Sequence, residues 1–144
     1  MIGAAPLSDD LSKQLMAILP GVDWTQAYGM TETATLTVQG PPGMDAVLGS
    51  AGRLICDTEA KVVSPTGEEL GYDTPGELWV RSPSVTLGYM NNRKATEEMF
   101  LSNGFMKTGD EVVITKAGDV FVVDRLKELI KVRQGSVAVR MFQR

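Results

Sequence analysis

Apolar residues recur at helical spacing near the start of the chain, from Ser8 to Leu19. Ser8 is a residue type that suits a helix N-cap, and the pair Pro20-Gly21 ends the pattern. The segment predicts a helix over 8–19. The short apolar segment 22–27 then predicts a strand that leads into a loop over 28–32.

After Gly40 the chain consists of short alternating runs that are separated by glycine and proline turns. A second, short helix is expected from about Lys94 to Phe100, with Asn91 or Asn92 as its cap. The last two strands suit a hairpin around a turn at 116–119. The strand candidates are Glu59 to Val63, Glu77 to Arg81, Glu111 to Thr115 and Val120 to Val123.

These elements predict an α/β (α+β) fold class. The first helix and strand are typical of the end of an α/β layer, and a mostly antiparallel β subdomain follows over about 48–123. Residues after Val123 begin a different unit.

Composition narrows the function classes. The chain has no histidine, which removes the commonest general base and argues against serine-histidine or cysteine-histidine hydrolysis and against a zinc site. A net charge of −4 with dispersed basic residues does not favour nucleic acid. The single cysteine, Cys56, is expected to be a buried thiol. No secretory leader or bilayer-spanning run is evident, so the sequence indicates an intracellular, cytoplasmic protein.

Three residues after the predicted strand carry groups that suit a nucleotide. Tyr28 offers an aromatic face for a base, Thr31 a neutral hydroxyl for phosphate or carboxylate oxygens, and Glu32 a hard oxygen ligand for magnesium. Taken singly, Tyr28 also suits an ordinary core position, and Thr31 and Glu32 also suit a helix cap or a turn.

Asp110 and Arg125 form a second candidate pair. An ionised aspartate can accept from both hydroxyls of a ribose, and a guanidinium gives fixed donors to ribose or phosphate oxygens. Asp110 follows Gly109 and also suits a turn, while Arg125 also suits a solvated surface position. Their separation along the chain agrees with a hairpin that brings them together.

The stretch Gln26-Ala27-Tyr28-Gly29-Met30-Thr31-Glu32, followed by Thr108-Gly109-Asp110 and Asp124-Arg125-Leu126-Lys127-Glu128, resembles the adenylate-forming superfamily. The resemblance is greatest to the branch of coumarate:CoA ligases and luciferase, and it covers Ile2 to about Arg133. It implies AMP-forming acid-thiol ligase chemistry: a carboxylic acid is joined to AMP with release of pyrophosphate, and the acyl group then passes to CoA. ATP, Mg²⁺, CoA and a small carboxylic acid are the implied cofactors and substrates, with no specific protein partner.

The resemblance also implies roles for individual residues. Ala4 and Ala5, in Gly3-Ala4-Ala5-Pro6, would form a wall of the adenine pocket, and Gln26 would lie on the same cofactor-binding side. Lys131 would lie near the CoA thiol. The segments that contain Trp79 and Tyr89 match family segments as well, and both side chains are expected to pack in the β subdomain rather than to meet substrate.

The resemblance divides the chain into 1–123, the C-terminal part of a large domain, and 124–144, the hinge and the start of a small domain. Gln134 to Arg144 depart from the family pattern. The family's glycine-rich phosphate loop and its distal lysine have no counterpart here, so we expect a piece of a ligase, truncated at both ends, that is inactive by itself. A catalytically inactive binding or interaction module and an unrelated β-rich binding domain are the alternatives. A peroxisomal location for a longer form also stays open.

Overall fold

The computed structural model describes residues 9–22, 25–34, 37–40, 47–126, 129–132 and 135–138. The described elements are α1 (Asp9–Ile18), β1 (Ala27–Tyr28), η1 (Thr31–Thr33), β2 (Val38–Gln39), β3 (Arg53–Leu54), β4 (Glu59–Val63), β5 (Glu69–Leu70), β6 (Gly76–Arg81), α2 (Arg93–Met99), β7 (Met106–Ile114), β8 (Val120–Arg125), β9 (Leu129–Val132) and β10 (Gly135–Ala138). The strands β9 and β10 pair with each other. The other strands form two sheets.

The larger sheet has five antiparallel strands in the order β5-β4-β6-β7-β8. Its central strand β6 alternates buried and partly exposed residues, so that Gly76, Leu78 and Val80 face the core. This alternation follows from the two-residue period of a strand, which places every second side chain on the same face. One face of the sheet therefore carries most of the apolar core.

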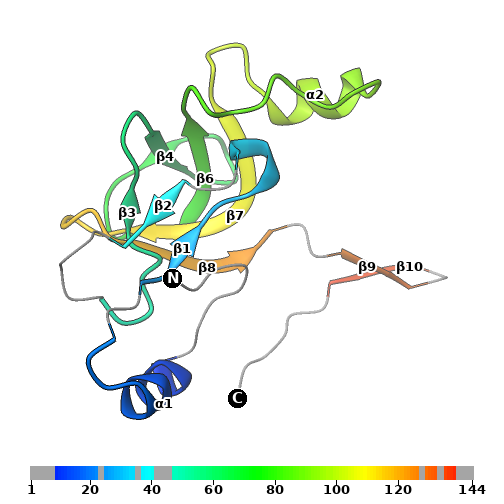
Figure 1. The fold of residues 1–144 in the computed structure, drawn as a ribbon. Helices are drawn as coiled ribbons and strands as arrows, with labels where there is room; N and C mark the ends of the chain where they lie inside the picture. Colours follow the sequence, from blue (N-terminus) through cyan, green and yellow to red (C-terminus); the bar gives the residue numbers. More distant parts are fainter. Residues whose placement is uncertain are drawn as a thin grey trace.

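The smaller sheet has the order β1-β2-β3 and lies across β6 and β7 in Figure 1. Val38 of β2 packs into the same core as Leu78 of β6 and Val120 of β8. Backbone hydrogen bonds join the chain just before β3 to the larger sheet: the Ala51 N–H donates to the Val120 carbonyl, and the Val120 N–H donates to the Gly52 carbonyl, each at 2.8 Å. The two sheets are therefore packed and hydrogen-bonded as one unit.

Gly52 is required at this junction. Its φ is +110°, and a Cβ built there would lie 2.2 Å from the carbonyl carbon of Gln39. Backbone approaches this closely only where no side chain intervenes.

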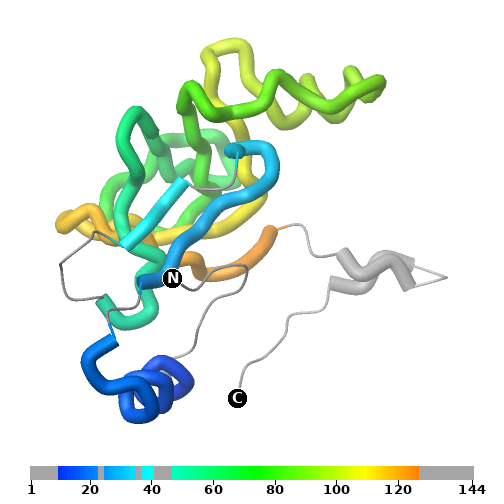
Figure 2. Tube along the Cα trace, in the orientation of Figure 1, coloured from blue at the N-terminus to red at the C-terminus, as the bar shows by residue number. Residues whose placement is uncertain are grey.

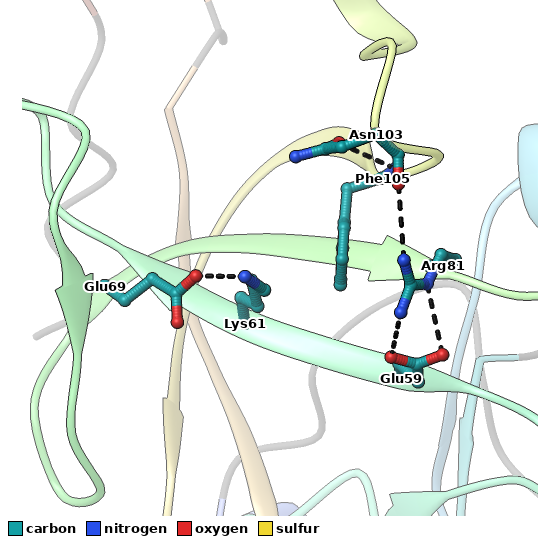
Figure 3. Close-up of polar contacts among 6 residues, drawn as sticks. All are labelled: Glu59, Lys61, Glu69, Arg81, Asn103 and Phe105. Carbon is teal, nitrogen blue, oxygen red and sulfur yellow. Dashed lines mark hydrogen bonds and ion pairs between the residues drawn. The ribbon is translucent and has the colours of Figure 1, made fainter.

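The outer face of the larger sheet is polar (Figure 3). Arg81 pairs with Glu59, and Lys61 pairs with Glu69. The same two cations lie against the Phe105 ring, with Lys61 Nζ 4.9 Å and Arg81 Cζ 4.6 Å from its centroid. Their aliphatic stems and charged ends cover an aromatic side chain that would otherwise meet water on this side.

The segment between β6 and β7 forms an arm that carries α2 (Figure 2). The Asn92 side chain accepts a hydrogen bond from the Ala95 N–H at 3.1 Å, which caps α2 as expected. The other helix, α1, lies at the opposite end of the view. Within the described ranges no helix has the length and apolar character that a bilayer crossing requires.

The two predicted helices are confirmed within one residue at each end, as are the strands that became β4 and β6. The hairpin around 116–119 is also confirmed, because the Thr115 N–H donates to the Asp119 carbonyl and the Gly118 N–H donates to the Thr115 carbonyl. The predicted strand at 111–115 begins earlier, at Met106, since β7 pairs with β6 as well as with β8.

Two predictions about the first half of the chain were wrong. Of the strand expected over 22–27, the described residues Val22 and Thr25 lie outside any strand and Gln26 forms a single bridge, while β1 begins at Ala27 and pairs with β2; residues 23–24 lie outside the described residues. Cys56 is exposed rather than buried. It lies in a turn whose next residue, Asp57, has a φ of +57°, and this turn directs the thiol to the surface.

Candidate functional site

Asp110 is held by the middle of β7. The Thr108 hydroxyl donates to the Leu78 carbonyl at 2.8 Å and accepts the Asp110 N–H at 3.2 Å. Between them Gly109 has a φ of +76°, which a residue with a side chain rarely adopts. The sequence Thr-Gly-Asp thus bends the strand locally and fixes the backbone of Asp110.

Both oxygens of the Asp110 carboxylate are engaged. The Tyr28 hydroxyl donates to Oδ2 at 2.6 Å, and Arg125 Nε lies 3.5 Å from Oδ1. Asp110 and Arg125 are cross-strand partners in the β7–β8 pair. The Asp110 side chain is 11% exposed and that of Arg125 is 60% exposed, so the carboxylate is buried behind a guanidinium that meets solvent.

Tyr28 connects the two sheets at this point, since it belongs to β1 and Asp110 to β7. Burial raises the pKa of the Tyr28 phenol well above its ordinary value, and the hydrogen bond to Asp110 adds to the shift. The phenol therefore stays neutral and remains a donor to the carboxylate.

Thr31 and Glu32 lie on the short 3-10 helix η1. The Thr33 hydroxyl donates to the Met30 carbonyl at 3.0 Å and accepts the Met30 N–H at 3.2 Å, which closes the turn from within. Thr33 is buried. Ala34 ends the turn with a φ of +51°. The buried threonine holds the backbone from one side and leaves Thr31 and Glu32 at the rim.

The Glu32 carboxylate has a partner from the arm between β6 and β7. The Tyr89 hydroxyl donates to Glu32 Oε1 at 2.5 Å and lies 3.0 Å from Met99 Sδ. Desolvation raises the pKa of Tyr89 to about 12, and the hydrogen bond to the Glu32 carboxylate contributes as well. This phenol too is a neutral donor over the physiological range.

A cavity of about 480 Å³ joins the turn η1 to the end of the β7–β8 pair. Cavities of this size accommodate small-molecule ligands. Its lining contains Gly29, Met30, Thr31, Glu32, Tyr89, Met99, Thr108, Gly109 and Arg125.

The structure gathers most of the predicted site residues. Thr31, Glu32 and Arg125 line the cavity, and Tyr28 and Asp110 lie directly behind Arg125. Gln26 is buried, and its carbonyl accepts the Gly40 N–H at 3.1 Å. Ala4 and Ala5 lie outside the described residues. Lys131 belongs to β9, where the backbone is described and the side chain is not.

Sequence reasoning missed Tyr89 and Met99. Tyr89 was expected to pack in the β subdomain, and its ring does pack edge-on against Phe100 there. Its hydroxyl also reaches Glu32, and its side chain lines the cavity, which the sequence did not predict. The sequence indicated that Tyr89 lies in a turn, because Gly88 precedes it and the helix cap Asn92 follows it, but not which distant group its hydroxyl would meet. Trp79, by contrast, lies on β6 away from the cavity lining, with its Nε1 donating to Glu77.

The oxygen ligands of the cavity suit a magnesium ion that is also bound by the phosphates of a nucleotide. The described residues contain no group of three or more cysteine, aspartate or glutamate side chains that could hold a metal ion by themselves. Magnesium in phosphate-binding sites commonly takes one or two protein carboxylates and completes its shell with water and phosphate oxygens. Glu32 at the cavity rim can provide one such carboxylate.

Comparison with known proteins identifies the family. The family model described as AMP-binding enzyme matches residues 1–90. The chain belongs to this AMP-binding family. Its fold agrees with solved members: the chain matches ATP-bound MatB from Rhodopseudomonas palustris with a TM-score of 0.81 and 33% identity, over 94% of this chain and 27% of that one.

Relatives within the family are named as acyl-CoA synthetases and CoA ligases. Acyl-CoA synthetase 7 of Caenorhabditis elegans is 42% identical over 138 residues, which cover 95% of this chain and 25% of that protein. Peroxisomal OPC-8:0-CoA ligase 1 of Arabidopsis thaliana is 39% identical over 140 residues, which cover 96% of this chain and 26% of that protein. The chain thus spans about a quarter of the length of these two relatives.

Proposed function

We propose that this chain carries part of the nucleotide site of an ATP-dependent acyl- or aryl-acid:CoA ligase. The observation that carries the proposal is the convergence of Thr31, Glu32 and Arg125 on one cavity, with the buried Asp110 directly behind. Membership in the AMP-binding family and the ATP-bound structural relative support ATP and AMP as the nucleotides.

In this proposal Asp110 accepts hydrogen bonds from the ribose hydroxyls. A carboxylate offers several lone pairs, so Asp110 can keep its contact with Tyr28 and still accept from a diol. Arg125, which is mostly exposed, supplies donors to ribose or phosphate oxygens from the same side.

Thr31 and Glu32 then face the phosphates and the acid. The Thr31 hydroxyl is neutral and can donate to a phosphate or carboxylate oxygen without repulsion. Glu32 provides the carboxylate for Mg²⁺, whose charge would lower the repulsion between the phosphates and the incoming carboxylate. Tyr28 offers its ring to adenine, and this stacking role stays a prediction, because its hydroxyl is held by Asp110 and its side chain is not part of the cavity lining.

The roles of the other predicted site residues are also part of this proposal. Ala4, Ala5 and Gln26 would complete the adenine side, and Lys131 would act during transfer of the acyl group to CoA. A cytoplasmic location is part of the proposal. Cell fractionation tests it against a peroxisomal one, since one relative is named as peroxisomal.

A second candidate function is nucleotide binding without turnover. Within the described ranges, Arg125 is the one cationic side chain in the cavity lining, whereas charge development on transferring phosphates is normally stabilised by several positive groups. A binding module with a single cation would hold ATP or AMP and release no pyrophosphate.

Binding and turnover are measured on the same 144-residue chain. ATP and AMP affinities come from equilibrium dialysis, and acid-dependent pyrophosphate release is followed with a panel of fatty and aryl carboxylic acids. Binding that weakens in Arg125→Ala supports the nucleotide site, and pyrophosphate release that requires the acid supports the ligase. Binding without release by this chain is the result that both candidates expect. They are separated by grafting the chain into a complete relative: acid-dependent pyrophosphate release that Arg125→Ala lowers supports the ligase, and absence of release favours the second candidate. Absence of ATP and AMP binding by a cooperatively folded chain contradicts both.

A further inference from the structure

Two hydrogen bonds join the arm between β6 and β7 to the turn η1, and both end on Glu32. The Thr86 N–H donates to the Glu32 carbonyl at 2.8 Å, and the Tyr89 hydroxyl donates to Glu32 Oε1 at 2.5 Å. One contact fixes the backbone of the turn and the other fixes its carboxylate. Glu32 is therefore held at both ends by residues that lie more than fifty positions along the chain.

Tyr89 itself is held firmly in place by α2. Its N–H donates to the Thr96 hydroxyl at 2.9 Å, and its ring meets Phe100 edge-on, with centroids 6.0 Å apart. Gly88 precedes it with a φ of +139°, and a Cβ there would lie 2.4 Å from Thr96 Cγ2. Such close packing leaves the phenol aimed in one direction, so the hydroxyl is oriented before any ligand arrives.

We propose that Tyr89 is a positioning residue that engages one oxygen of Glu32, so that this carboxylate offers the other oxygen as a single ligand and selects Mg²⁺ over Ca²⁺. The inference rests on the proposed function, in which Glu32 meets the metal that accompanies ATP. It adds Tyr89 to the proposed nucleotide site and assigns to that site a preference for Mg²⁺ over Ca²⁺.

The selectivity follows from the coordination habits of the two ions. Ca²⁺ takes six to eight oxygens and often binds a carboxylate through both of them, whereas Mg²⁺ requires a near-octahedral shell and binds few carboxylates. A carboxylate with one oxygen already accepting a short hydrogen bond is a poor chelating ligand and remains a good single ligand. Residues that hydrogen-bond to a metal ligand, without touching the metal themselves, normally orient that ligand and tune the affinity of the site for the metal.

A purely structural role for Tyr89 makes a different prediction. If the residue only anchored α2, its ring contact with Phe100 and its N–H bond to Thr96 would carry that function. Tyr89→Phe keeps both and deletes the hydroxyl alone. The matched control is Tyr72→Phe, which makes the same chemical change at an exposed tyrosine outside the cavity lining.

The experiment measures binding of ATP to the full chain by equilibrium dialysis, with MgCl₂ or with CaCl₂ as the only divalent salt. We expect the ratio of Mg²⁺-supported to Ca²⁺-supported affinity to fall about tenfold in Tyr89→Phe and to stay unchanged in Tyr72→Phe.

Glu32→Gln separates failure of this inference from failure of the proposed function. If Glu32→Gln lowers metal-supported ATP binding while Tyr89→Phe leaves the Mg²⁺/Ca²⁺ ratio as it was, the Tyr89 inference is overturned and the nucleotide site stands. If Glu32→Gln leaves the metal dependence of binding unchanged, the metal role of Glu32 fails, and the Tyr89 inference fails with it. Circular dichroism and thermal melts of each variant confirm that the compared proteins are folded.

Discussion

The two sheets that build the site are stabilised in different ways. In the larger sheet, β7 carries Asp110, spans nine residues and is paired on both sides, with β6 and with β8. β1, β2 and β3 span two residues each. The larger sheet is thus held by long ladders that register shifts interrupt near Glu77 and Glu111. The smaller sheet depends on its own Val38, which packs in the shared core, and on the backbone bridge at Gly52.

This difference separates two kinds of site residue. Asp110 sits on a strand that would keep its geometry without any ligand, so it offers a fixed acceptor. Thr31 and Glu32 sit on one turn that follows a two-residue strand and is held by Thr33, Thr86 and Tyr89. Nucleotide recognition would therefore combine a rigid half of the site, which contains Asp110, with a second half, which contains Thr31 and Glu32 and depends on contacts from the arm between β6 and β7.

The largest expected effect comes from the core of the larger sheet. Leu78→Ala removes a fully buried side chain and should lower the free energy of unfolding by about 2–5 kcal/mol. Leu87→Ala, at a fully exposed leucine, should change it by less than about 0.5 kcal/mol. Urea denaturation followed by circular dichroism measures both. Similar losses for the two variants would mean that the larger sheet does not carry the stability of the chain.

The junction between the sheets is tested by Gly52→Ala. The added methyl would collide with the Gln39 carbonyl, so we expect it to cost about 1–3 kcal/mol more than Gly67→Ala. Gly67 is the matched control because its φ of +89° carries similar backbone strain while no atom lies within 4 Å of the added group. Equal melting temperatures for the two variants would show that the bridge contributes nothing to the smaller sheet.

The rigid half of the site is tested by Asp110→Asn, which keeps the shape of the side chain and removes its charge. ATP affinity should fall about tenfold, since hydrogen bonds to charged groups exceed those to neutral ones. Glu111→Gln on the same strand is the control, because neighbouring side chains of a strand point to opposite faces. Isothermal titration calorimetry compares them, and an ATP affinity that is unaffected by Asp110→Asn would remove Asp110 from the nucleotide site.

The smallest effect is expected from the hydrogen bond that joins the sheets at the site. Tyr28→Phe should lower the free energy of unfolding by about 1 kcal/mol at neutral pH. The pKa of Tyr28 is raised in the folded protein above its ordinary value of 10.0, so its contribution is complete below that pH and is lost as the pH rises through the folded pKa.

The gap in stability between wild type and Tyr28→Phe should therefore narrow when urea denaturation is repeated above pH 10. A gap that stays constant with pH would contradict the assigned contact between Tyr28 and Asp110, and with it the link between the two halves of the site.

Most predictions that rest on interactions between residues close in the sequence were correct. The two helices, the hairpin around 116–119 and the cap of α2 arise from interactions within a few positions, and these have clear signatures in the sequence. The return of the chain that brings Asp110 near Arg125 also followed from the hairpin, but their exact pairing did not. The register at the turn would place Asp110 opposite Asp124, and an irregularity between Glu111 and Val112 places it opposite Arg125 instead. The strand predicted over 22–27 was wrong at the described residues Val22 and Thr25, because strand pairing depends on a partner elsewhere in the chain, and β2 pairs with Ala27 and Tyr28.

The sequence by itself determined the family, the two helices, the main strands of the larger sheet and the residue types of the candidate site. Only the tertiary structure decided how the site is supported. The Tyr28 hydroxyl meets an aspartate 82 positions away, and the Tyr89 hydroxyl meets a glutamate 57 positions away. Contacts of that separation depend on how the sheets and the arm pack, because no local sequence pattern records which distant group a phenol will face.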